Sequence, residues 1–250
     1  MFLYTDENAK VVKDKLSRSD VYIRSIITSQ PIRSLKPRGE DVLVMDYGLG
    51  NLYSIVKAVE SLGFGVRVIS SGDEMVGSST AILPGVGAFP DGIAGLKERG
   101  FHTALEKYIS GNGRLLGICL GAQMLLSTGN EFEQMKGLNV VDGSIDLLAG
   151  EDMKVPNVGW NPLQVCEQPK NFNCQIFRGL DENSQVYFNH SYFFNLRGSS
   201  TGIPLATCNY SRFKFCAAFC NTSGNVCGVQ FHPEKSGPIG MRILQNFLIG

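Results

Sequence analysis

The stretch Arg114-Leu-Leu-Gly-Ile-Cys-Leu-Gly-Ala-Gln-Met-Leu-Leu-Ser127 decides the fold. Residues 115–118 predict a short buried strand, and residues 120–126 predict the start of a helix. Cys119 lies between them in the frame Gly-Ile-Cys-Leu-Gly, which has the pattern of a nucleophile elbow with Cys in place of Ser. Such a turn lifts one side chain above the end of a sheet, and its flanking glycines let backbone segments pass closely. The helix N-terminus favours a thiolate. The alternative is a buried structural cysteine.

The segments around the elbow predict an α/β fold. Apolar runs at 42–45, 66–69 and 81–83 predict strands, while residues 52–62 and 92–110 have helical spacing, the second broken near Gly100. Asn51 is a plausible N-cap of the first of these helices. This order predicts a mostly parallel central sheet with helices on both faces, in three layers. After Gly150, short β-like segments predict a β-rich second half (155–161, 186–193, 215–219 and 226–231), closed by a helix over 240–248.

Composition excludes several classes of protein. Of the 250 residues, 43% are hydrophobic, which is enough for a large core. The formal net charge is zero, so we expect no nucleic-acid partner. No run approaches the roughly 20 apolar residues of a membrane span, and the N-terminus lacks the apolar core of a signal peptide. We therefore expect no membrane association.

Cysteine spacing indicates neither disulfides nor a metal site. The seven cysteines are an odd number, none are spaced as Cys-x-x-Cys, and no His neighbours them at metal-ligand spacing. We therefore expect a reducing, cytoplasmic location, no metal and no cofactor. The turn Gly48-Leu-Gly50 lacks the third glycine of a dinucleotide-binding loop, because Tyr53 occupies that position.

Residues 1–39 differ from the rest of the chain. They hold eight basic and four acidic residues, a net charge of +4, and they end in a linker-like segment around Pro31 and Pro37. Residues 21–27 are apolar enough to form a strand or to pack against the body. We expect residues 1–39 to be a basic N-terminal extension, either solvated or a docking arm, and residues 40–250 to form the functional domain.

A second chemical motif follows the strand predicted at 226–231. His232-Pro-Glu234 places an imidazole and a carboxylate two residues apart, and residues i and i+2 of an extended segment point to the same side. A nearby imidazole can take the proton of a cysteine thiol, and a carboxylate can hold that imidazole in the required tautomer. The alternative is a surface histidine in a turn.

A nucleophilic Cys followed by His and Glu two apart near the C-terminus resembles the class I glutamine amidotransferases, which implies their flavodoxin-like fold. Within that family the chain is most similar to the glutaminase subunits of imidazole glycerol phosphate synthases, over residues 41–249. Six motifs carry the resemblance: Asp46-Tyr-Gly-Leu-Gly-Asn-Leu-Tyr-Ser-Ile55, Pro84-Gly-Val-Gly-Ala-Phe89, Gly117-Ile-Cys-Leu-Gly-Ala-Gln123, Pro156-Asn-Val-Gly-Trp-Asn161, Tyr187-Phe-Asn-His-Ser-Tyr192 and Gln230-Phe-His-Pro-Glu-Lys-Ser236.

The resemblance implies a role for each motif. Cys119 attacks the carboxamide of L-glutamine, His232 is the base, and Glu234 orients the base. Backbone N–H groups at Leu120 and in the loop ending at Gly87 form the oxyanion hole. The residues that hold glutamine are Gln123, His190, Ser191 and Tyr192, although His190 could instead be a buried core histidine.

The resemblance also implies a partner. The ammonia passes to a synthase subunit that makes imidazole glycerol phosphate and AICAR in histidine biosynthesis, in a heterodimer; Asn51, Trp160 and Lys235 match positions that face this partner. The chain departs from the family at Asn157, Val158 and Ala122. Two alternatives therefore stay open: a paralogous glutaminase subunit that feeds a sugar amidotransferase of surface-polysaccharide biosynthesis, and a stand-alone γ-glutamyl hydrolase. A non-catalytic binding module is a third, which the complete Cys-His-Glu set disfavours.

Overall fold

The computed structural model describes residues 39–150, 153–170, 172, 174–196 and 198–250. The expected basic extension, with its possible strand at 21–27 and the linker-like segment after it, therefore lies outside the described residues except for Gly39.

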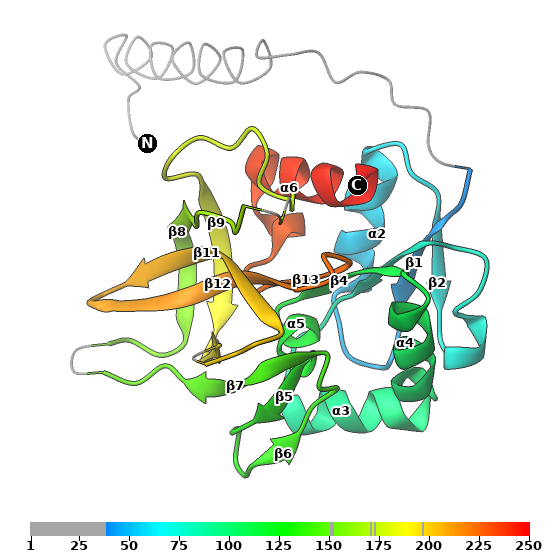
Figure 1. Cartoon of the computed structure of the whole chain (residues 1–250), viewed down its shortest axis with the longest axis horizontal. Helices are drawn as coiled ribbons and strands as arrows, with labels where there is room; N and C mark the ends of the chain where they lie inside the picture. Colours follow the sequence, from blue (N-terminus) through cyan, green and yellow to red (C-terminus); the bar gives the residue numbers. More distant parts are fainter. Residues whose placement is uncertain (1–38, 151–152, 171, 173, 197) are drawn as a thin grey trace, which may run out of the picture. The chain divides into compact units, whose positions relative to one another are not determined.

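Five parallel strands form the centre of the sheet (Figure 1). Their spatial order is β2 (Val66–Ile69), β1 (Val42–Met45), β3 (Thr80–Leu83), β4 (Arg114–Ile118) and β13 (Val226–Val229). The strands β1, β3 and β13 are buried along their whole length, and so is β4 after Arg114, as expected for apolar strands covered on both faces. Pairing of β13 with β4 brings the residues that follow Val229 next to Cys119.

The second half of the chain extends this sheet with mostly antiparallel pairs. Beyond β13 come β12 (Phe213–Asn221), β10 (Tyr192–Asn195), β7 (Val141–Leu147), β5 (Leu126–Gly129) and β6 (Met135–Lys136). A branch leaves β12 through β11 (Gly202–Tyr210) and β8 (Asn157–Val165) to β9 (Gln185–His190). The branch brings β9 close to the elbow, where the carbonyl oxygen of Asn189 lies 3.9 Å from the sulfur of Cys119.

Helices cover both faces of the parallel strands (Figure 1). On one face lie α2 (Leu52–Ser61) and α6 (Gly237–Ile249), whose apolar side chains share one core cluster. On the other lie α3 (Phe89–Glu98), α4 (Phe101–Ser110) and α5 (Leu120–Met124), which share a second cluster. The short 3-10 helices are η1 (Gly72–Glu74) and η2 (Pro233–Lys235). The predicted three-layer α/β fold is confirmed, and no described helix is long and apolar enough to span a membrane.

Several predicted boundaries were wrong. The helix expected over 120–126 ends at Met124, because backbone N–H groups of Leu138 and Asn139 bind the carbonyl oxygens of Met124 and Leu126 and start β5. Such long-range pairing leaves no local signal. The helix expected over 92–110 is two helices joined at Gly100, whose φ of 70° suits glycine. Asn51 precedes α2 as predicted, but its side chain makes no capping hydrogen bond.

Candidate active site

Cys119 occupies a strained turn between β4 and α5. Its backbone has φ 52° and ψ −110°, an unfavourable region for a residue with a Cβ. The turn is tight enough that a Cβ added at Gly121 would lie 1.9 Å from the carbonyl oxygen of Leu83. A Cβ added at Gly117 would lie 2.7 Å from Cα of Ala122. Both glycines are therefore required for the close approach that the elbow pattern predicted.

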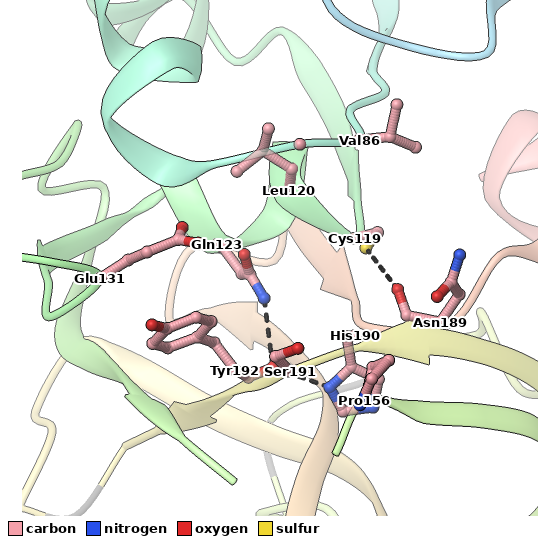
Figure 2. A pocket seen from close by; sticks show the side chains of 11 residues that line it. Val86, Cys119, Leu120, Gln123, Glu131, Pro156, Asn189, His190, Ser191 and Tyr192 are labelled. Atoms are coloured by element: carbon pink, nitrogen blue, oxygen red, sulfur yellow. Dashed lines mark hydrogen bonds between the residues drawn. The ribbon is translucent and has the colours of Figure 1, made fainter.

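Two groups contact the sulfur of Cys119. Its Sγ lies 3.9 Å from the carbonyl oxygen of Asn189, and the side-chain amide of Gln230 donates to it at 3.6 Å (Figure 2 shows the first contact). Gln230 is fully buried and accepts a hydrogen bond from Nε2 of Gln123 at 3.2 Å. The same Gln123 nitrogen lies 3.2 Å from the carbonyl oxygen of Tyr192. The sulfur is thus held in a network that links β13, α5 and β10.

His232 and Glu234 form a close pair. Nδ1 of His232 lies 2.8 Å from Oε1 of Glu234, and each side chain is only 2% exposed. The extended geometry expected for this segment was wrong: Glu234 lies in η2, and only His232 is extended, with φ −100° and ψ 96°. The observed turn still brings both side chains together.

The charge state of His232 depends on its neighbours. Burial alone would lower the pKa of His232. Cys119 and Glu234 act in the opposite direction and outweigh burial, so the pKa is raised from 6.5 to about 10. Its Nε2 atom has no hydrogen-bond partner among the described residues. An imidazolium at neutral pH next to a thiol favours the thiolate. The ring can therefore exchange a proton at Nε2 while Glu234 holds Nδ1.

A buried serine fixes the position of His232. Ser236 donates its hydroxyl to the carbonyl oxygen of His232 at 2.6 Å and accepts from the backbone N–H of Tyr187 at 2.9 Å. The N–H of His232 in turn donates to the carbonyl oxygen of Tyr187 at 2.9 Å. These three hydrogen bonds tie the segment from His232 to Ser236 to strand β9.

A cleft of about 260 Å³ opens beside Cys119. This is smaller than the roughly 300–1,000 Å³ of cavities for drug-sized ligands, and it suits an amino acid. Its lining includes six of the residues expected around glutamine and the oxyanion: Gly87, Leu120, Gln123, His190, Ser191 and Tyr192. Gly87 has φ 112°, which is open to glycine but strained for other residues.

Sequence reasoning missed several members of this lining. They are Val86, Glu131, Pro156 and Asn189, and Figure 2 labels all four around the cleft. Glu131 is the only acidic residue in the described lining, and one of its oxygens accepts the backbone N–H of Phe89 at 2.6 Å. It belongs to none of the six motifs, so the sequence carried no local signal for it.

The side chain of His190 is fully engaged inside the protein. Its Nδ1 donates to the carbonyl oxygen of Tyr192 at 2.7 Å, and its Nε2 accepts from the amide of Asn157 at 3.1 Å. Burial lowers the pKa of His190 to about 4, so the ring is neutral at neutral pH. Both ring nitrogens are occupied, which favours the reading of His190 as a buried core histidine that shapes the cleft wall. Asn157, a departure from the family pattern, is its fully buried partner.

Of the three residues expected at a partner interface, Trp160 and Lys235 are exposed, whereas Asn51 is half-buried. Trp160 is 51% exposed and packs edge-on against Tyr187, with 6.2 Å between the ring centroids. Its ring also borders Gly237, two residues after the exposed Lys235. Asn51 begins helix α2, which packs against η2. Trp160 therefore contacts Tyr187, the residue of β9 whose carbonyl oxygen accepts the backbone N–H of His232.

The geometry agrees with the comparison to known proteins. The family model "Glutamine amidotransferase class-I" matches residues 43–250, which include the elbow, the cleft and the His-Glu pair. The chain belongs to the class I glutamine amidotransferase family.

Relatives of this amidotransferase chain include subunits of one synthase. It is 38% identical over 207 residues to "Imidazole glycerol phosphate synthase subunit HisH" of Methanosarcina barkeri, covering 83% of this chain and 97% of that protein. The proteins of the same name from Chlorobium chlorochromatii and Geobacter sulfurreducens are 38% and 37% identical, each over 82% of this chain.

Solved structures support the fold. The "Structure of PurLQS from Thermotoga maritima" superposes with a TM-score of 0.66 at 20% identity, covering 86% of this chain and 99% of that one. A "Crystal structure of glutamine amidotransferase" gives a TM-score of 0.64 at 19% identity, covering 83% and 97%. At these identities the likeness concerns the fold alone.

Proposed function

We propose that this amidotransferase chain is the glutaminase subunit of an imidazole glycerol phosphate synthase, which hydrolyses L-glutamine and passes the ammonia to a synthase subunit. The similarity to HisH subunits over nearly their whole length supports a role in histidine biosynthesis. The proposed chemistry rests on Cys119 and the His232–Glu234 pair, because Cys119 lies close enough to His232 to raise the pKa of that histidine. All seven cysteines are free thiols, which supports a reducing, cytoplasmic location.

In this proposal the reaction proceeds through a thioester. The Cys119 thiolate adds to the carboxamide carbon, and the developing oxyanion accepts hydrogen bonds from backbone N–H groups at Leu120 and Gly87. The N–H of Leu120 opens α5 and has no acceptor within that helix. His232 then gives its Nε2 proton to the departing ammonia, and it activates the water that hydrolyses the thioester. Glu234 keeps the imidazole oriented throughout.

The cleft contains groups that can bind the α-ammonium and α-carboxylate groups of glutamine. The Glu131 carboxylate supplies a negative charge for the α-ammonium group. Ser191 and Tyr192 also line the cleft (Figure 2), where their backbone and hydroxyl groups can bind the α-carboxylate. Gln123 acts indirectly, because its amide is already bound to Gln230 and Tyr192.

A synthase subunit would bind the region of Asn51, Trp160 and Lys235. From there the contact of Trp160 with Tyr187 leads to the backbone hydrogen bonds that hold His232. The loop that contains Gly87 can turn a peptide plane toward the oxyanion site, and completion of that site on binding would couple hydrolysis to the acceptor. A missing oxyanion donor is worth about 10²–10³-fold in rate.

Glutamate release provides the test. It is measured for the pure chain, with a candidate synthase subunit, and with that subunit plus its acceptor. We expect the loaded complex to exceed the pure chain by about 10²–10³-fold. Trp160→Ala and Lys235→Ala should reduce this stimulation, whereas the control Lys214→Ala, an exposed lysine on β12, should not. A pure chain with full, partner-independent activity would favour the γ-glutamyl hydrolase, and stimulation only by a sugar amidotransferase would favour the paralogous subunit.

A further inference from the structure

Three cysteines that do not line the cleft come close together. Sγ of Cys220 lies 3.2 Å from Sγ of Cys227, which lies 3.8 Å from Sγ of Cys174. All three sulfur atoms lie within 4.8 Å of one another. Cys220 and Cys227 are directly paired across β12 and β13, and Cys174 comes from the segment between β8 and β9. Cys227 precedes His232 by five residues, which is roughly 16 Å in an extended chain.

We propose that Cys174, Cys220 and Cys227 form a binding site for a thiophilic d10 metal ion, either Zn²⁺ or Cu⁺. Zn–S bonds of about 2.3 Å in tetrahedral geometry place neighbouring sulfur atoms about 3.8 Å apart, and the observed separations surround this value. Thiolate ligands select Zn²⁺ and Cu⁺ over the hard cations that prefer oxygen. Sequence analysis predicted no metal site, because these cysteines come from three segments and their spacing matches no metal motif.

A positive charge lies near the three sulfur atoms. The guanidinium of Arg114, which lies 4.9 Å from the centre of the Phe247 ring, attracts negative charge on Cys174. One metal ion and this guanidinium together offset most of the negative charge of three thiolates, which would otherwise be costly to bury.

A second layer of contacts positions the cluster. Gln168 holds the backbone of Cys174 from both sides: its Oε1 accepts the N–H at 2.8 Å, and its Nε2 donates to the carbonyl oxygen at 2.9 Å. Outer contacts of this kind orient ligands in metal sites. Cys220 and Cys227 are buried, whereas Cys174 is partly exposed and gives an ion its route of entry.

Metal competition tests this proposal on the reduced full chain under anaerobic conditions. One arm titrates Zn²⁺ against a chromophoric chelator, and the other titrates Cu⁺ against a Cu⁺-specific chelator. We expect one ion per chain in at least one arm, and the arm with the tighter binding identifies the metal. Native mass spectrometry reads the stoichiometry. Co²⁺ in place of Zn²⁺ should give a sulfur-to-metal charge-transfer band.

Matched variants separate this cluster from the other cysteines. Cys174→Ser should weaken binding by about 10²-fold or more, since a ligand is lost. Cys216→Ser and Cys208→Ser remove thiols outside the cluster and should leave binding unchanged. Unaltered glutaminase activity of Cys174→Ser serves as the check of folding, and Cys174→Ala provides a second variant. Binding that survives loss of Cys174, or no ion held in either arm, overturns the proposal; so does a Cys220–Cys227 disulfide that persists in the freshly reduced protein.

Discussion

The side-chain amide of Gln230 donates to the sulfur of Cys119, with 3.6 Å between Nε2 and Sγ. Gln230 is fully buried, and Gln123 binds its Oε1 atom, which fixes the amide in the orientation that points its N–H at the sulfur. A donor held in this way stabilises a thiolate more than a thiol, because hydrogen bonds to a charged acceptor are stronger. Gln230 therefore helps to set the reactivity of Cys119 from the side of β13.

Replacement of Gln230 should lower the reactivity of Cys119. Gln230→Leu removes a hydrogen bond to the sulfur, which is worth about 1.5–3 kcal/mol when the acceptor is charged, so alkylation of Cys119 should slow about tenfold or more. The measurement is the rate of alkylation of Cys119 at neutral pH. The control is Gln164→Leu, at an exposed position on β8. An alkylation rate equal to that of the wild type would show that the amide has no electrostatic role.

A glutamine-like electrophile should label Cys119 alone. The cleft lies beside this sulfur, whereas burial raises the pKa of Cys208 and of Cys216 to about 12 and keeps both as thiols. A small general thiol reagent should behave differently, since Cys174 is partly exposed. Peptide mapping by mass spectrometry reads both reactions. Label from the glutamine analogue on any cysteine other than Cys119 would contradict the elbow assignment.

Stability should depend on pH through His232. The pKa of this histidine rises from 6.5 to about 10 on folding, so between these values the folded chain binds more protons than the unfolded chain. Its contribution is complete below about pH 6.5 and is lost as the pH rises toward about 10. Glu234→Gln removes one cause of the raised pKa.

The melting temperature of wild type should therefore exceed that of Glu234→Gln most at about pH 6, and the difference should shrink toward about pH 10. His102→Gln provides the control, because His102 is well exposed and lies 4.0 Å from Glu106. A difference between wild type and Glu234→Gln that stays constant with pH would mean that the carboxylate does not act on the imidazole.

Asn157 should contribute to stability through His190. Asn157→Leu leaves the buried Nε2 atom of His190 without a partner, at a cost of about 1–3 kcal/mol in the free energy of unfolding. Asn161→Ala removes only a donor to Asn157 at a half-buried position, and it should cost about 0.5–1.5 kcal/mol. Urea unfolding measures both. Equal effects of the two substitutions would show that the His190 contact adds nothing.

The sequence predicted the parallel half of the fold well, because its signals are local. The strands over 42–45 and 66–69 have the predicted bounds, and the helix before Gly63 has the predicted spacing. Strands β5 and β11 were not predicted. Their pairing partners lie far along the chain, and their residues are only partly apolar, so no periodic pattern distinguished them from loops.

The candidate site was predictable where a motif carries its chemistry. Cys119, His232 and Glu234 stand in short motifs, and the structure brings them together; their catalytic roles stay predictions. Glu131 stands in no motif, and only the fold brings it to the cleft. The hydrogen bond between His190 and Asn157 could not be predicted from the sequence either, because it depends on the register that pairs β8 with β9.

The backbone of Cys119 sets a limit on how stable this protein can become. A non-glycine residue at φ 52° and ψ −110° stores about 1–3 kcal/mol of strain, which the surrounding sheet and helix must hold in place. Glycine at position 119 would relax that strain and remove the nucleophile at once. A search for heat-resistant variants without selection for turnover would therefore favour inactive chains, so selection must be applied to both properties together.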